Sequence, residues 1–109
     1  MANISASIMQ GQGGKQYKWS GVTENDTPLT VNVDSGLYTL TIEGSYGGMS
    51  IEMLYGKSAG NEASVDADNL TFTENKSENI AIGQGFCLPS LTGGSSASVD
   101  IYLSPIANR

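Results

Sequence analysis

The stretch GLYTLTIEGSYGGMSIEMLY, from Gly36 to Tyr55, carries the clearest evidence for the fold class of this chain. Apolar and polar residues alternate strictly on both sides of the glycine-bearing segment Ser45–Gly48. The apolar positions are Tyr38, Leu40, Ile42, Met49, Ile51 and Met53. A period of two is typical of a strand with one buried face, and a slip of one residue would turn every apolar side chain outward. The sequence therefore predicts a β-hairpin with its turn at Ser45–Gly48.

Shorter runs of the same kind occur on both sides of this stretch. The predicted strands cover residues 4–8, 16–22, 29–33, 37–43, 49–55, 70–73, 79–82, 85–88 and 97–103, with a short one near 63–65. Pro89 ends the run before it or restricts that run to a sheet edge. No apolar pattern with helical spacing extends beyond about two turns. We expect an all-β chain: a single-domain antiparallel β-sandwich of about eight or nine short strands, with jelly-roll or immunoglobulin-like connections.

The apolar phase of the clearest strands defines the expected core. Its residues are Trp19, Tyr38, Leu40, Ile42, Ile51, Val99, Ile101 and Leu103. A chain of 109 residues makes one domain. Residues 1–15 are predicted to be an N-terminal arm or first strand with a glycine-rich hinge at Gly11–Gly14, and residues 16–109 the sandwich domain. Cys87 is the only cysteine, so stability must come from packing, oligomerisation or docking on a partner.

The net charge of the chain indicates which classes of partner it can bind. Eleven acidic residues against five scattered basic ones give a net charge of −6, whereas nucleic acid is bound by clustered Lys and Arg. We therefore expect no nucleic-acid partner. No segment approaches the ~20 apolar residues of a membrane helix, and the N-terminus lacks the pattern of a signal peptide. We expect no membrane partner and synthesis in the cytoplasm.

Residues suited to catalysis or metal binding are scarce. The chain has no histidine, the commonest general base and metal ligand. Cys87 lies in an apolar run without a neighbouring base, so we expect a structural thiol. The acidic segment 66–69 has Thr71 and Ser77 where a calcium loop needs glycine and glutamate, which favours a solvated turn. The prediction is a protein that is not an enzyme, with no catalytic residue, cofactor or metal ligand.

Tyr17 and Trp19 fall on the same face of one predicted strand. They could form a sugar-stacking platform, but core packing is the favoured interpretation.

Several short motifs occur in a fixed order between residues 16 and 105. They are Tyr17-x-Trp19-x-Gly21-Val22-Thr23, Asp26-Thr27-Pro28, Gly36-x-Tyr38-x-Leu40, Gly47-Gly48, the GFCLP step from Gly85 to Pro89, Gly93-Gly94 and the closing strand Ser98–Leu103. This order resembles small bacteriophage virion proteins of the capsid cement or decoration type. The resemblance implies a homotrimer that binds the major capsid protein on the outer surface of the virion and stabilises the shell. The chain lacks the fuller aromatic and basic content of some relatives, so a tail- or fibre-associated carbohydrate- or receptor-binding module is the alternative.

Two sets of apolar residues are the candidates for the interface. Ile4 and Ile8, on the apolar face of the N-terminal arm, would pack against a neighbouring subunit. Leu37, Leu54 and Tyr102, in the outward phase of the strands, would share one apolar patch between subunits. An acidic protein inside the shell would be repelled by packaged DNA, which favours the outer surface.

Overall fold

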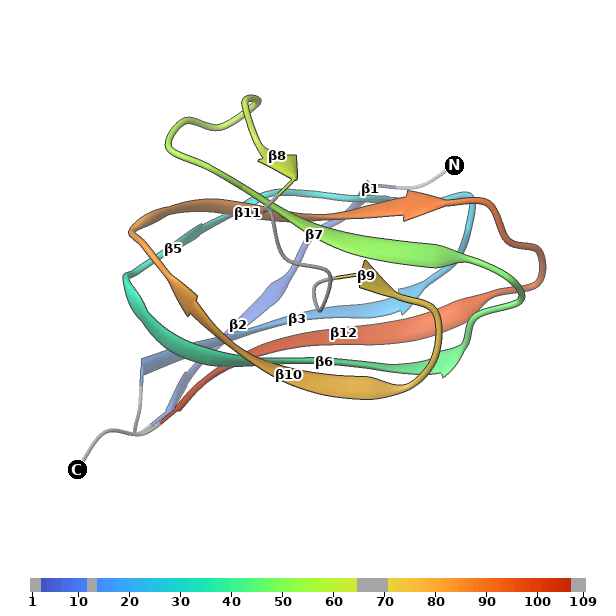
Figure 1. Ribbon diagram of the computed structural model, residues 1–109, viewed down its shortest axis with the longest axis horizontal. Coiled ribbons are helices and arrows are strands. Elements are labelled where there is room, and N and C mark those ends of the chain that lie inside the picture. Colours follow the sequence, from blue (N-terminus) through green and yellow to red (C-terminus); the bar gives the residue numbers. More distant parts are fainter. Residues whose placement is uncertain (1–2, 12–13, 65–70, 107–109) are drawn as a thin grey trace.

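The computed structural model describes residues 3–11, 14–64 and 71–106. Two antiparallel sheets pack face to face as a β-sandwich (Figure 1), and the described residues form no helix. The predicted fold class is therefore confirmed.

The two sheets of the sandwich are called sheet I and sheet II. Sheet I has the order β10-β6-β12-β3-β2, from β2 (Ser7–Gly11), β3 (Gly14–Val22), β6 (Gly36–Ser45), β10 (Lys76–Ile82) and β12 (Ser98–Pro105). Sheet II has the order β5-β11-β7-β8, with β9 also paired to β7, from β5 (Val31–Val33), β7 (Ser50–Gly56), β8 (Ala63–Ser64), β9 (Thr71–Phe72) and β11 (Gly85–Thr92). A separate parallel pair joins β1 (Asn3–Ile4) to β4 (Thr27–Pro28).

The described residues thus contain twelve strands, of which β1, β4, β8 and β9 have only two residues each. The predicted run 4–8 forms two strands, β1 and β2, and β4 was not predicted.

The strand pairs are nested along the chain. β7 pairs with β8 and β9, β6 with β10, β5 with β11, and β3 with β12. From β3 onward the longer strands alternate between sheets I and II. Nested antiparallel pairs wound over two sheets form a jelly roll, so the structure distinguishes between the two predicted topologies.

The predicted hairpin is wrong in its pairing, although both of its strands exist. β6 lies in sheet I and β7 in sheet II, so the segment between them crosses the end of the sandwich (Figure 1). Tyr46 and Met49 in this segment are both buried, and the Met49 N–H donates to the Tyr46 carbonyl at 2.8 Å. Because both side chains enter the core, the chain turns across the sandwich and does not return along the same sheet.

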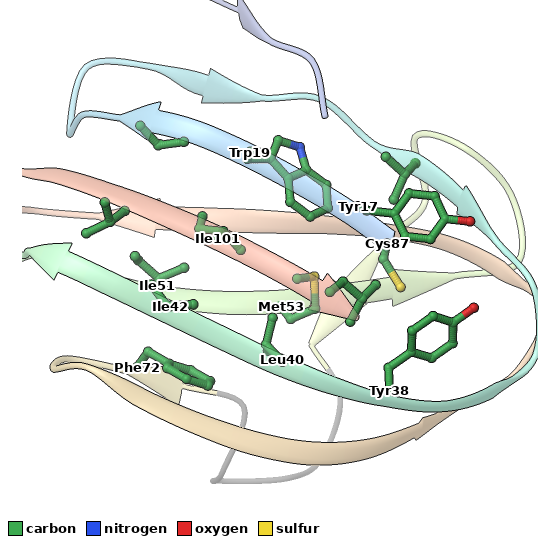
Figure 2. Close-up of a cluster of buried hydrophobic side chains, with 14 of the residues drawn as sticks. Tyr17, Trp19, Tyr38, Leu40, Ile42, Ile51, Met53, Phe72, Cys87 and Ile101 are labelled. Atoms are coloured by element: carbon green, nitrogen blue, oxygen red, sulfur yellow. The ribbon is translucent and has the colours of Figure 1, made fainter. Parts of the chain in front are cut away.

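The core lies between the sheets and contains all eight residues predicted for it, each at most 4% exposed. Side chains from β3, β6 and β12 meet side chains from β7 and β11 (Figure 2). Tyr17, Met53, Phe72 and Cys87 are buried in the same cluster.

The buried aromatic residues place their polar atoms against backbone carbonyls. Tyr17 Oη donates to Asn32 O at 3.1 Å, Trp19 Nε1 to Leu29 O at 2.9 Å, Tyr38 Oη to Asp34 O at 2.8 Å and Tyr46 Oη to Ile42 O at 3.1 Å. Buried polar groups need such partners, since an unpaired one costs about 1–3 kcal/mol. Burial, with a smaller contribution from Glu74, raises the pKa of Tyr46 to about 12.

Pro89 lies inside β11 and does not end it. β5 pairs with β11 only over Gly85–Cys87, whereas β7 continues to pair as far as Thr92. At Pro89, β11 therefore has a strand partner on one side only, which is where a residue without an N–H group is tolerated.

The N-terminal segment lies on the domain as strands. β2 pairs with β3 from Ser7↔Lys18 to Gly11↔Gly14, and Ile4 is half-buried against the core. Of the predicted hinge Gly11–Gly14, residues 12 and 13 lie outside the described residues.

Candidate functional site

Cys87, for which a structural role was predicted, is buried in the core. It is 1% exposed, and burial, with a smaller contribution from Glu62, raises the pKa of its thiol to about 12. A neutral, inaccessible thiol is a poor nucleophile, and its burial confirms the predicted structural role. Across the described ranges, no three His, Cys, Asp or Glu side chains gather as a metal site would require. The acidic segment 66–69 lies outside the described residues.

The aromatic pair Tyr17 and Trp19 is 1% and 0% exposed. Core packing is therefore confirmed for both residues, and a sugar-stacking platform built from them is excluded. Tyr102, on the outer face of sheet I, is half-buried beneath Lys18, whose Nζ lies 4.9 Å from the ring centroid.

The five residues predicted for an interface do not come together. Ile4 is half-buried on the chain's own core, whereas Ile8 on β2 and Leu37 on β6 are 57% and 58% exposed. Leu37 and Tyr102 belong to sheet I, but Leu54 belongs to β7 in sheet II. The prediction that Leu37, Leu54 and Tyr102 share one patch is wrong, because β6 and β7 lie in different sheets and their outward side chains point away from each other.

The edge of sheet I formed by β2 is the least protected sheet edge among the described residues. Its sequence SIMQG has no charge and no proline, and Ile8 and Met9 are 57% and 61% exposed. The opposite edge, β10, carries an ion pair between Lys76 and Glu78 at 3.7 Å, while the edge strands of sheet II have only two or three residues. Short or charged edges resist pairing with other chains, and a longer apolar edge invites it.

A groove of about 410 Å³ separates β2 from β5. Ile8 and the 37% exposed Leu29 line it, together with Lys15 and Asp34. Ile8 points toward the interior side of sheet I, since it pairs with the buried Tyr17, but sheet II ends at β5 and does not cover it. The β2 edge thus exposes apolar side chains on both of its faces.

A second groove, of about 250 Å³, lies over the outer face of sheet II beside β4. Leu54 and Leu88, which are cross-strand partners, line it with Pro28. Glu24 and Asp26 add two carboxylates to the lining. We call this surface the acidic groove.

Met9, Leu29 and Leu88 are surface residues of interest that were not predicted from the sequence. Leu88 follows the buried Cys87 in the same strand, so its outward orientation could have been predicted from the alternation in residues 85–88. Leu29 gave no such signal, because it precedes β5 and its exposure depends on where sheet II ends.

Glu24 also holds together the loops at one end of the sandwich. Its carboxylate accepts hydrogen bonds from the Ala97 N–H at 2.8 Å and the Ser96 N–H at 3.3 Å, although the residues are more than seventy positions apart. These bonds, first that from Ala97, lower the pKa of Glu24. The pKa of Glu62 is also lowered, chiefly by the hydroxyl of Thr30.

These lowered pKa values predict that the free energy of unfolding decreases at acidic pH. Because the folded-state pKa of Glu24 lies below its unfolded value, its contribution is present above the unfolded value of about 4.5 and is lost as the pH falls through the folded value. Glu24→Gln should lower the urea midpoint at pH 7 and reduce the difference between the midpoints at pH 7 and pH 3. Glu43→Gln, at an exposed position on β6, is the control for loss of one carboxylate. An unchanged pH dependence in Glu24→Gln would contradict this assignment.

Comparison of the chain with family models, with curated proteins and with solved structures finds no match. In the described ranges, no helix is long and apolar enough to cross a membrane.

Proposed function

We propose that this chain is a non-enzymatic structural protein of a bacteriophage virion, which binds the outer surface of the assembled capsid as a cement or decoration protein. The observation that supports it most is the β2 edge, where Ile8 and Met9 are exposed on an uncharged strand. In an isolated monomer such an edge favours aggregation, whereas in an assembly it can form the contact with a neighbouring subunit. The proposed partners are the major capsid protein and further copies of this chain.

The motifs that carry the resemblance consist largely of residues that maintain the fold, so they support the proposal only indirectly. Its residues Tyr17, Trp19 and Tyr38 are buried, and Gly47 and Gly48 form the turn between the sheets. A fold can serve many functions, so the functional proposal depends on the exposed surfaces of the two sheets.

Copies of the chain are proposed to meet at the β2 edge, in a homotrimer. Ile8 and Met9 would be covered there by a neighbouring subunit, and the main-chain groups on the free side of β2 would find partners. The net charge of −6 favours the outside of the shell over the DNA-filled interior.

The test is the stability of particles with and without the protein. A ligand that binds only the assembled lattice stabilises it by RT ln(1 + [L]/Kd), about 2.7 kcal/mol per site at a hundredfold excess over Kd. Particles stripped of the protein should release DNA at a lower temperature than complete particles, and adding the purified protein back should restore the higher temperature. Equal release temperatures, with the protein located on a tail fibre, would overturn the proposal.

The outer face of sheet I favours one second candidate, a carbohydrate-binding module of a tail or fibre. Its hydroxyl and amide groups form cross-strand hydrogen bonds around Tyr102. These are Thr39–Asn79 at 2.8 Å, Thr41–Ser77 at 2.8 Å and Ser104–Gln16 at 3.1 Å. Polar side chains beside an aromatic ring suit a sugar. Glycan-array binding that Tyr102→Ala abolishes would support this candidate.

A further inference from the structure

The acidic groove has an apolar floor on the outer face of sheet II. Leu54 on β7 and Leu88 on β11 are directly opposite each other and half-buried, and Phe86 is the next outward residue along β11. Cross-strand partners on one face have their Cβ atoms about 4.5–5.5 Å apart. The two leucines therefore form a continuous apolar surface, which Pro28 of β4 borders on one side.

The border of the groove is negatively charged. Glu24 and Asp26 line it, and Glu52 lies directly across from Ser90, which also lines it. No basic side chain is among the described residues that line the groove.

The lysines of the described part of the chain lie elsewhere. Lys15 and Lys18 belong to β3 and Lys76 to β10, all in sheet I, and Lys57 donates to the Gln84 carbonyl at 3.1 Å beyond the end of β7. The groove therefore joins an apolar floor to a border of carboxylates.

We propose that this groove docks a segment of the major capsid protein that presents an apolar side chain flanked by Lys or Arg. The apolar side chain would contact Leu54, Leu88 and Pro28, and the basic side chains would meet the carboxylates. A second copy of this chain does not fit as the occupant of a two-fold contact, because such a contact would place the same carboxylates opposite one another. The inference depends on the proposed function only for the source of the segment.

The first experiment tests the ligand class without capsids. Backbone amide NMR spectra of the whole chain are recorded during titration with the peptide Lys-Leu-Lys-Leu-Lys, acetylated and amidated at its ends. Shifts should centre on the amides of Leu54 and Leu88, and the affinity should fall as NaCl rises from about 50 to about 500 mM because salt screens exposed charges. The matched peptide Glu-Leu-Glu-Leu-Glu should not bind.

Variants test the two components of the groove separately. Leu88→Ser should weaken binding at least about tenfold, the loss of an apolar contact worth about 1.4 kcal/mol. Glu52→Gln should weaken it roughly two- to fivefold, as for a single surface ion pair. Leu37→Ser removes an exposed leucine from sheet I and should bind like the unmodified chain. Thermal unfolding confirms that each variant is folded.

Several results would overturn the inference. They are an absence of shifts up to about 5 mM peptide, equal binding of the glutamate peptide, equal effects of Leu88→Ser and Leu37→Ser, or shifts centred on the β2–β5 groove. Stripped particles then test the source of the segment. If Leu88→Ser binds them as well as the unmodified chain does, the groove is not the capsid contact, although cement function stands. If the unmodified chain binds the lysine peptide but no particle, the proposed function fails and the ligand class of the groove is supported.

Discussion

Trp19→Ala is expected to lower the free energy of unfolding by about 3–5 kcal/mol, the largest loss among single substitutions in this core. Trp19 is the largest of the fully buried side chains and packs between the two sheets (Figure 2). Truncation would leave a cavity that the surrounding strands can fill only in part. It would also remove the indole N–H that donates to the Leu29 carbonyl at 2.9 Å. A domain of this size has only about 5–15 kcal/mol of stability.

Urea unfolding followed by circular dichroism measures this effect. Trp19→Phe keeps most of the ring volume but removes the donor, so it should cost less than Trp19→Ala. Leu37→Ala, at a position that is 58% exposed, should change the stability by no more than about 0.5 kcal/mol. A loss below about 1 kcal/mol for Trp19→Ala would show that the side chain is not in the core.

Gly47→Ala is expected to cost about 2–5 kcal/mol, although it adds a single methyl group. Gly47 has φ 56°, in the left-handed region, where a side chain costs about 1–2 kcal/mol. A Cβ atom built there would also lie 2.0 Å from the carbonyl oxygen of Ser95. That contact belongs to the backbone of the 93–97 loop, which is held in place because the Ser95 N–H donates to the Gly47 carbonyl at 3.0 Å. Relief of the clash must move one of the two loops, at a cost of about 1–3 kcal/mol for overpacking.

The adjacent residue provides the matched control. Gly48 has φ 86°, but a Cβ atom there would meet no other atom within 4 Å. Gly48→Ala should therefore show the backbone strain alone, and the difference between the two variants measures the contact with the 93–97 loop. Equal losses for the two substitutions would mean that this contact contributes nothing.

The fold class could be predicted from sequence because alternation is a local signal. Each predicted run overlaps a strand, and all eight predicted core residues are buried. The pairing of β6 with β7 could not be predicted correctly, because a glycine-bearing turn between two alternating runs suits both a hairpin and a crossing between sheets. The buried Tyr46 and Met49 favour the crossing, and their burial depends on the opposite sheet.

The candidate surfaces likewise could not be predicted from local sequence patterns. The exposure of Leu37 agrees with its outward assignment by sequence, yet its grouping with Leu54 is wrong. Ile8 is exposed for another reason: it lies on the interior side of sheet I, where sheet II does not cover it. The acidic groove unites Leu54 and Leu88 with Glu24, residues separated by at least thirty positions along the chain. Nothing in the local pattern of any one of these segments indicates that they are neighbours.

Local patterns were enough to predict that this chain forms strands and which face of the clearest strands is apolar, because these properties depend on neighbouring residues and on the burial preference of each side chain. The jelly-roll order, the uncovered β2 edge and the acidic groove emerge only in three dimensions. Those features depend on which strands pair across long separations and on where each sheet ends. Strand pairing is in turn determined by the packing of side chains throughout the core, and no single local segment determines it.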